Sequence, residues 1–211
     1  MVSSSKENIL KKIRQALSNS VPLPFPKSEG NNSVFQAQSD DLEIQFAEEF
    51  TKLLGKFAFC MNEADLKNQL KKLIEINNWQ NIYCREENLF HIISQSAPYQ
   101  VDHTSLAECD ASITSCEYLI ARTGTIVLSS AQQSGRTVSV YAPIHIFIAY
   151  TDQLVYDIKE ALQLLKEKYA GNIPSSISFA TGPSRTADIE KTLVVGVHGP
   201  KEVYLFLVDR V

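Results

Sequence analysis

The feature that most constrains the fold is an alternation of helical periodicity with short apolar runs, which begins at residue 40. Residues 40–55 and 63–78 repeat apolar residues at helical spacing, and each is followed by an apolar run, FAFC at 57–60 or NIYC at 81–84. A strand that is apolar on both faces is covered on both faces. The pattern therefore predicts an α/β fold with a mostly parallel central sheet flanked by helices.

Further elements follow in the same style. ENLFHIIS at 87–94 predicts a short helix, and residues 113–150 predict several strands because β-branched and aromatic residues dominate them. A helix is expected within DQLVYDIKEALQLLKEKYAG at 152–171, and Gly171 stands just beyond its end. Its predicted inner face holds Leu154, Ile158, Leu162 and Leu165. SISFA at 176–180 and EVYLFLVD at 202–209 complete the predicted strands.

The first 39 residues differ from the rest. Ser4-x-x-Glu7 resembles a capping box, and the apolar residues Ile9, Leu10, Ile13 and Leu17 then fall on one stripe of a helix. The segment 21–33 has three prolines and excludes a helix. We therefore expect an arm over 1–39 and a domain over 40–211, with the helix docking on its own domain, on another subunit or on a partner.

Composition excludes several classes of function. A net charge of -4 argues against a nucleic-acid partner. No run is long enough to span a bilayer and the N-terminus lacks a signal-peptide core, so a cytoplasmic protein is expected. Cys60, Cys84, Cys109 and Cys116 are too widely spaced for a C-x-x-C motif, which favours free thiols and no metal site.

The stretch TGPSRTADIEKTLVVGVHGPKE, at 181–202, is the first candidate site. We read a strand that ends in a Gly-Pro turn and a helix over 184–190 capped by the Ser184 hydroxyl. Such a turn at the carboxyl edge of a sheet suits a small anion, held by Gly182, Ser184, Arg185 and Thr186. The alternative is a capped helix in which Arg185 only pairs with a nearby acid such as Asp188.

Three further features have both a functional and a structural interpretation. The second Gly-Pro turn brings His198 and Lys201 either to that edge or into a surface hairpin. Thr123, Gly124 and Thr125 form either a cradle that a ligand approaches closely or an ordinary turn. His145 lies in an apolar strand and is expected to be a hydrogen-bonded core residue. The standard dinucleotide, P-loop, zinc-protease and serine-hydrolase motifs are missing.

The segments GPSRTADIEKTLVVGVHGPKEVYLFLVD, IARTGTIVLSS and APIHIFIA resemble the LUD domain family, over roughly residues 40–211. The resemblance implies a fold of the NagB/RpiA/CoA-transferase-like type and a place in a bacterial system that oxidises L-lactate to pyruvate. It also implies partner proteins that carry the iron–sulfur clusters, with no cofactor in this chain. In that setting His198 is the candidate catalytic proton acceptor, and the residues of the two Gly-Pro turns and the Thr-Gly-Thr run bind a small carboxylate or other anion.

One residue departs from the family pattern, because Arg122 stands where Glu is common. A cation here removes a carboxylate nucleophile and favours anion binding. Two alternatives stay open: an independent enzyme acting on an acyl-CoA, sugar-phosphate or folate-like substrate, and a non-enzymatic scaffold or regulator.

Overall fold

The structure is a computed structural model that describes residues 5–18, 41–94, 100–102, 105–189 and 192–210. The chain divides into two units, residues 1–38 and 39–211. The first unit contains helix α1 (Ser5–Leu17), in the segment where the sequence predicts an N-terminal helix. The expected cap at Ser4 and the proline-rich segment at 21–33 lie outside the described residues.

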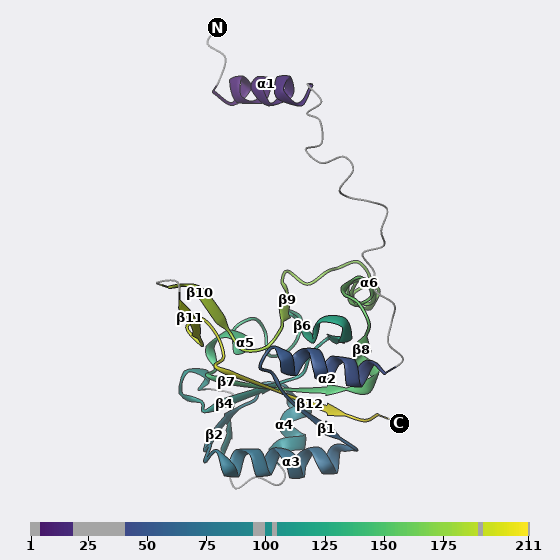
Figure 1. Ribbon diagram of the computed structural model, residues 1–211, viewed down its shortest axis with the longest axis vertical. Helices are drawn as coiled ribbons and strands as arrows, with labels where there is room; N and C mark the ends of the chain where they lie inside the picture. The colour runs from purple at the N-terminus through teal and green to yellow at the C-terminus, as the bar shows by residue number, and fades with distance from the viewer. Residues whose placement is uncertain (1–4, 19–40, 95–99, 103–104, 190–191, 211) are drawn as a thin grey trace. The chain divides into compact units, whose positions relative to one another are not determined.

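The second unit is built on a six-stranded sheet with the order β1-β12-β7-β4-β2-β3 (Figure 1). All of its strand pairs are parallel, which confirms the predicted α/β fold and the apolar strands at 57–60 and 81–84. The strands are β1 (Lys56–Cys60), β2 (Asn81–Tyr83), β3 (Gln100–Asp102), β4 (Ala111–Thr114), β7 (Ile144–Tyr150) and β12 (Glu202–Val208).

Helices cover both faces of this sheet. On one face α2 (Leu42–Lys52) buries Phe46 and Phe50 completely. On the other face lie α3 (Glu63–Ile76) and α4 (Glu87–Ser94), whose apolar residues share a core with β1, β2 and β12 (Figure 1). Helix α3 begins where the Asn62 side chain accepts a hydrogen bond from the backbone N–H of Asp65. The sheet is thus positioned between two apolar layers, as its sequence requires.

A second sheet of four strands has the order β8-β5-β6-β9. Its strands are β5 (Tyr118–Ile120), β6 (Thr125–Ser129), β8 (Leu154–Val155) and β9 (Ile177–Ala180). Helix α6 (Ile158–Lys168) packs on this sheet through the buried Ala161 and Leu165. Short helical segments complete the fold: α5 (Val138–Tyr141) and 3₁₀ turns at Leu106–Glu108, Ala121–Thr123 and Thr151–Gln153.

The long helix expected over 152–171 starts later than its periodicity suggested. Leu154 and Val155 pair with β5 as a strand, and the Asp157 side chain then accepts the Lys159 N–H at the helix start. Consequently the predicted apolar face is only partly correct, because Leu165 is buried while Ile158 and Leu162 are exposed.

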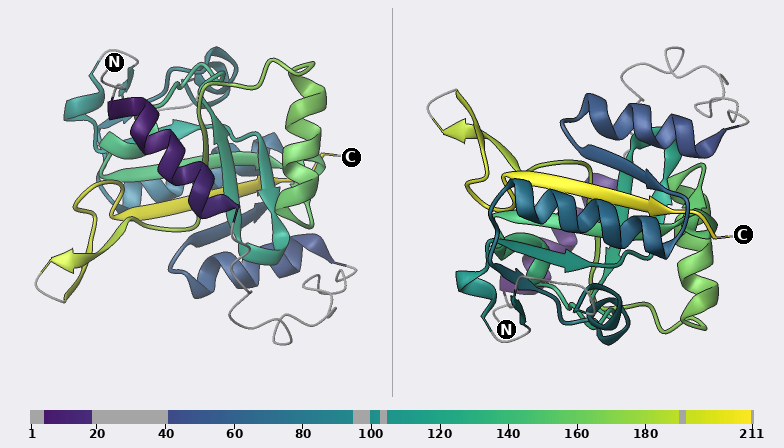
Figure 2. Two further views of the ribbon diagram at one scale, coloured as in Figure 1. Left: turned by 90° about the horizontal axis from the view of Figure 1, so that it is seen from above. Right: turned by 90° about the horizontal axis from the view of Figure 1, so that it is seen from below.

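The helix predicted over 184–190 is wrong, because residues 185–189 and 192–195 pair as two antiparallel strands of a hairpin. Its strands are β10 (Arg185–Ile189) and β11 (Thr192–Val195), and in both views of Figure 2 the yellow-green hairpin projects from the edge of the domain. β-Branched residues such as Thr186, Val194 and Val195 favour strands over helix, and this preference outweighed the capping signal of Ser184.

The two Gly-Pro turns meet at the base of this hairpin. The backbone N–H of Ser184 donates to the Pro200 carbonyl, and the Ser184 carbonyl accepts from the Gly196 N–H, each at 2.9 Å. A side chain at Gly199 would place its Cβ 2.9 Å from the Ser184 Cβ. The close spacing of the turns in sequence therefore serves to clamp the hairpin to the domain.

One histidine is enclosed in the core, as its apolar surroundings predicted. His145 is 1% exposed, and its Nε2 lies 2.8 Å from the Thr114 hydroxyl. Its Nδ1 is buried and has no partner among the described residues. Burial lowers the pKa of His145 from its ordinary 6.5 to about 3, because the charged imidazolium cannot be solvated there.

Candidate functional site

The structure divides the predicted site residues between two pockets. Thr123 and Thr125 line a pocket of about 510 Å³, which we call the threonine pocket. His198 and Lys201 line a separate pocket of about 410 Å³. The single anion site predicted from sequence is therefore not assembled as one cavity among the described residues.

The threonine pocket lies at one end of the second sheet. Strands β5, β8 and β9 end there and β6 begins there, while α2 contributes its last turn and α6 its first residue. The lining residues are Glu49, Leu53, Ile120, Arg122, Thr123, Thr125, Ile158, Phe179 and Thr181. Its volume falls within the usual range for small-molecule sites, about 300–1,000 Å³.

Three threonine hydroxyls form a connected chain in this pocket. The Oγ1 atoms of Thr123 and Thr125 are 2.7 Å apart, and those of Thr125 and Thr181 are 3.0 Å apart. Each hydroxyl has one proton, and the two contacts use two of the three protons. When Thr125 donates within the chain, the O–H of Thr123 or Thr181 at one end remains to donate to a ligand oxygen; when both outer hydroxyls donate to Thr125, its own O–H reaches the Thr123 carbonyl at 3.4 Å.

A guanidinium group stands beside the hydroxyls. The Nε atom of Arg122 lies 2.8 Å from the Asp157 carboxylate, and the Arg122 side chain is partly exposed. The buried Nε makes no aligned hydrogen bond with the described residues, so its contact with Asp157 is an ion pair. Arg122 has five donor hydrogens in all, and the terminal nitrogens remain for a planar anion.

The rest of the lining is mostly apolar. Leu53, Ile120, Ile158 and Phe179 supply hydrocarbon surface, of which Phe179 is 41% exposed. Glu49 is the acidic residue of the lining, and its carboxylate forms a salt bridge with Lys52 at 2.7 Å. The pocket thus offers one cation and hydroxyl donors against an apolar wall, which is a suitable arrangement for a small carboxylate with a short hydrocarbon tail.

Gly124 has a different use from the one its sequence suggested. Its φ is 58°, and an added Cβ would lie 2.4 Å from the Phe50 backbone nitrogen. The close approach that requires glycine is therefore made by helix α2, not by a ligand. Gly124 shapes the pocket indirectly, because it lets α2 sit against the turn that carries Thr123 and Thr125.

The residues of the first Gly-Pro turn also hold structure together. A Cβ at Gly182, whose φ is 93°, would lie 2.7 Å from the Leu53 carbonyl oxygen. The Arg185 guanidinium donates to that same carbonyl from an exposed position, and Thr186 pairs with Val194 across the hairpin. None of these residues, nor Ser184, lines the threonine pocket among the described contacts.

His198 and Lys201 were expected at the carboxyl edge of a sheet, but they lie at the amino ends of strands. The Lys201 N–H donates to the Pro143 carbonyl, just before β7 and β12 begin, so this turn lies at the amino ends of the two strands. Both side chains are exposed, and the pocket also contains Tyr141 and Gly196. His198 is thus separated from the threonine hydroxyls that it was expected to assist.

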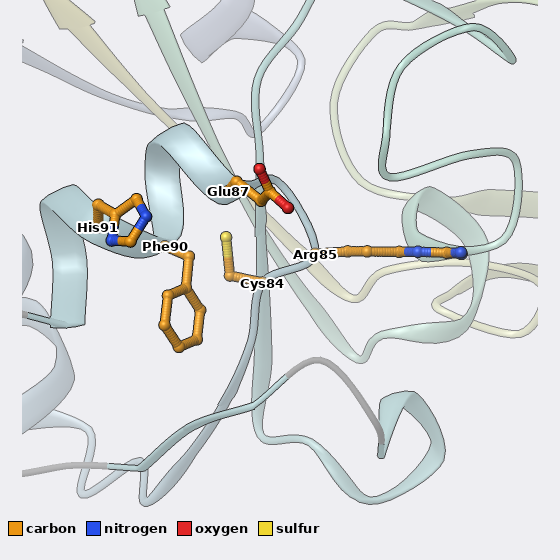
Figure 3. A pocket seen from close by; sticks show the side chains of 5 residues that line it. All are labelled: Cys84, Arg85, Glu87, Phe90 and His91. Carbon is orange, nitrogen blue, oxygen red and sulfur yellow. The ribbon is translucent and has the colours of Figure 1, made fainter.

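The carboxyl edge of the six-stranded sheet does hold a pocket, but with other residues. A cavity of about 310 Å³ at the end of β2 is lined by Cys84, Arg85, Glu87, Phe90 and His91. In Figure 3 the Arg85 side chain points away from Phe90 and His91. Because its polar groups do not converge, we prefer the threonine pocket as the candidate site.

The four cysteines are buried and free of disulfides. Burial raises the pKa of the Cys60 and Cys84 thiols to about 12 and that of Cys109 to about 11. Metal and cluster ligation requires the thiolate, which these environments disfavour. Within the described ranges, no three His, Cys, Asp or Glu side chains are grouped as a metal site, and no helix is long and apolar enough to cross a membrane.

Sequence reasoning missed part of the pocket. The sequence pattern indicated Gly182 as a ligand-binding residue but not its neighbour Thr181. It gave no indication of Glu49, which lines the pocket, or of Asp157, which pairs with Arg122. Strand β6 pairs with both β5 and β9, and this pairing brings the ends of β5 and β9 to the same edge of the sheet. No local sequence pattern reveals the pairing. The one sequence signal for an anion site in this pocket was Arg122, a cation directly before Thr123.

Comparison with known proteins identifies relatives. A protein named Lactate utilization protein C from Bacillus licheniformis is 41% identical over 106 residues, which cover 49% of this chain and 44% of that protein. One of the same name from Anoxybacillus flavithermus is 28% identical over 219 residues, which cover 97% of this chain and 98% of that protein.

A crystal structure of a DUF162 family protein from Deinococcus radiodurans has the same fold. It superposes with a TM-score of 0.61 at 20% identity, covering 79% of this chain and 96% of that one. Residues 87–208, more than half of the chain, match the LUD domain. The chain therefore belongs to the LUD domain family.

Proposed function

We propose that this chain acts in lactate utilization and that its threonine pocket binds a small 2-hydroxy or 2-oxo carboxylate. The relatives named Lactate utilization protein C support the first part of this proposal. The observation that carries the second part is the convergence of Arg122 with three linked threonine hydroxyls in one partly apolar pocket.

Each part of such a ligand has a matching group. The carboxylate pairs with the terminal nitrogens of Arg122 in a planar, charge-assisted contact. The free O–H of the threonine chain donates to the oxygen on the second carbon, and the methyl group lies against Ile120 or Phe179. Asp157 and Glu49 keep the pocket close to neutral, so we expect weak, reversible binding of an abundant metabolite.

Oxidation of a 2-hydroxy acid to a 2-oxo acid releases two electrons and two protons, which need an acceptor. We propose that iron–sulfur clusters in partner proteins take the electrons and that this chain holds none of its own. The wide spacing of Cys60, Cys84, Cys109 and Cys116 in the sequence supports that division. In this proposal the complex works in the cytoplasm, where the cysteines stay reduced.

We predict that Arg122→Gln weakens binding of L-lactate and pyruvate at least about tenfold, because a charge-assisted hydrogen bond contributes about 1.5–3 kcal/mol. Stability should fall by about 1–3 kcal/mol, because the buried Asp157 carboxylate loses its cationic partner. Isothermal titration calorimetry measures the affinity and urea unfolding measures the stability. Arg185→Gln is the matched control, because Arg185 is not among the residues that line the pocket and only donates to the backbone carbonyl of the lining residue Leu53.

The two arginine variants separate the possible sites. Loss of binding in Arg122→Gln with retention in Arg185→Gln supports the threonine pocket. The reverse result would restore the site predicted from the Gly-Pro turn, and equal affinities in all three proteins would refute a role for either arginine. Thr125→Val, which replaces the central hydroxyl with a methyl group, should weaken binding as well.

A further inference from the structure

The outer edge of strand β1 presents backbone groups that nothing in the sheet uses. Among the described residues β1 pairs only with β12. The Cys60 carbonyl accepts from the Asp209 N–H next to β12, so Cys60 and every second residue before it face that strand. Because hydrogen-bonding direction alternates along a strand, Phe57 and Phe59 direct their N–H and C=O groups to the open edge.

Two side chains occupy part of this edge. The Gln69 side-chain amide donates to the Phe59 carbonyl at 3.0 Å, and the Met61 N–H donates to the Asp65 carboxylate at 3.1 Å. Both contacts are at exposed positions, so an incoming strand can replace the Gln69 contact at small cost. Among the described residues, the N–H and C=O of Phe57 and the N–H of Phe59 have no hydrogen-bond partner, so they can pair with an incoming strand.

Apolar pockets flank this edge on both faces of the sheet. On the α2 side, Ile44, Ala47, Phe57 and Phe59 line a pocket of about 540 Å³. On the α3 side, Ala58, Leu73 and Ile76 line one of about 340 Å³. Figure 1 shows α2 and α3 on opposite sides of β1.

Large apolar side chains are left in water at these pockets. Ile44 is 58% exposed, Phe59 is 44% exposed and Ile76 is 78% exposed. Exposed apolar edges are usually blunted or covered, since they invite pairing with another chain. An open edge with a pocket on each face matches the needs of strand addition, in which alternate side chains enter opposite pockets.

We propose that the β1 edge binds an extended apolar segment of a different protein, which adds a strand to the sheet. The backbone of that segment pairs with Phe57 and Phe59. Its alternate side chains enter the α2-side and α3-side pockets. The proposed role of this surface is separate from that of the threonine pocket, and the proposal does not require the carboxylate ligand.

Charge distinguishes a foreign strand from a second copy of this chain. The α2-side pocket has an acidic rim of Glu43, Glu48 and Asp209, and the α3-side pocket includes Lys72. Antiparallel pairing of two β1 edges about an axis normal to the sheet places the two acidic rims on the same side. Like charges then face each other, whereas a partner with Lys or Arg on its α2-facing side complements the rim.

The test selects short linear peptides from a displayed library against the full-length protein and measures synthetic copies by fluorescence anisotropy. The enriched peptides should have apolar residues at alternating positions and a basic residue among the positions that face the α2 side. Glu43→Lys/Glu48→Lys should weaken binding at least about tenfold, as expected for reversal of an interface charge pair. The matched control is Glu108→Lys/Glu167→Lys, which changes exposed acids away from the edge and should bind normally.

Gln69→Ala provides a readout specific to strand pairing. Removing this competing donor should tighten peptide binding about two- to tenfold, since a hydrogen bond contributes about 0.5–1.5 kcal/mol net. Enrichment of helical i, i+3/i+4 patterns, equal affinity in the acidic-rim and control variants, or weaker binding in Gln69→Ala each contradict the proposal. So does a dimer, seen by sedimentation, that Phe59→Lys dissociates, because the edge would then belong to a second copy.

Discussion

Gly124→Ala is expected to destabilise the protein by about 2–5 kcal/mol, from about 1–2 for a side chain in the left-handed region and about 1–3 for the added clash. The new Cβ would lie 2.4 Å from the Phe50 nitrogen and 2.7 Å from the Glu49 backbone carbon. These are backbone atoms of a helix, which cannot yield as a flexible side chain would. Urea unfolding monitored by circular dichroism measures the loss.

Gly135→Ala is the control that isolates the contact with α2. Gly135 also has a positive φ, 69°, yet an added Cβ would meet nothing within 4 Å. This variant should lose only about 1–2 kcal/mol, the cost of the backbone conformation. Equal losses in the two variants would mean that α2 does not press on the Thr-Gly-Thr turn as the structure has it.

The second large effect is loss of stability on mild acidification. His145 has a folded-state pKa of about 3 and an ordinary pKa of 6.5, so the unfolded chain binds the extra proton between these values. The stability is complete above pH 6.5 and falls as the pH drops toward 3. Between pH 7 and pH 5 the free energy of unfolding should decrease by about 2 kcal/mol, at about 1.4 kcal/mol per pH unit once the unfolded chain is protonated.

His145→Gln tests this assignment, because glutamine does not titrate and still offers Thr114 a hydrogen-bonding group. The variant should be less stable at pH 7 than the wild type but nearly flat between pH 7 and pH 5. Urea unfolding at several pH values gives both curves. If both proteins lost stability equally on acidification, another group would be responsible.

The fold was largely predictable because its central strands are short and apolar on both faces. FAFC, NIYC and EVYLFLVD have few alternative uses, and they became β1, β2 and β12. The hairpin was not predictable in the same way, because Ser184 and the nearby acids carry a local helix-start signal. Pairing with β11 through Thr186 and Val194 decided the outcome, and that term depends on residues further along the chain.

The candidate site was predictable only in part. Thr123 and Thr125 were identified from the Thr-Gly-Thr run, and the structure joins them through their hydroxyls. Thr181 enters the same chain from β9, across a sheet whose existence was not predicted. The prediction that Gly124 and Gly182 contact a ligand was wrong, because these glycines instead allow the close approach of α2 and of Leu53, the residue that follows it.

Titration of the ¹⁵N-labelled protein with L-lactate, followed by amide and arginine side-chain NMR signals, locates the carboxylate site directly. Binding in the threonine pocket should shift signals at Arg122, Thr123, Gly124 and Thr181, with little change at His198 and Lys201. Shifts confined to the Gly196–Lys201 turn or to the Cys84–His91 pocket, or no shifts at millimolar lactate, would contradict the assignment of the carboxylate site to the threonine pocket.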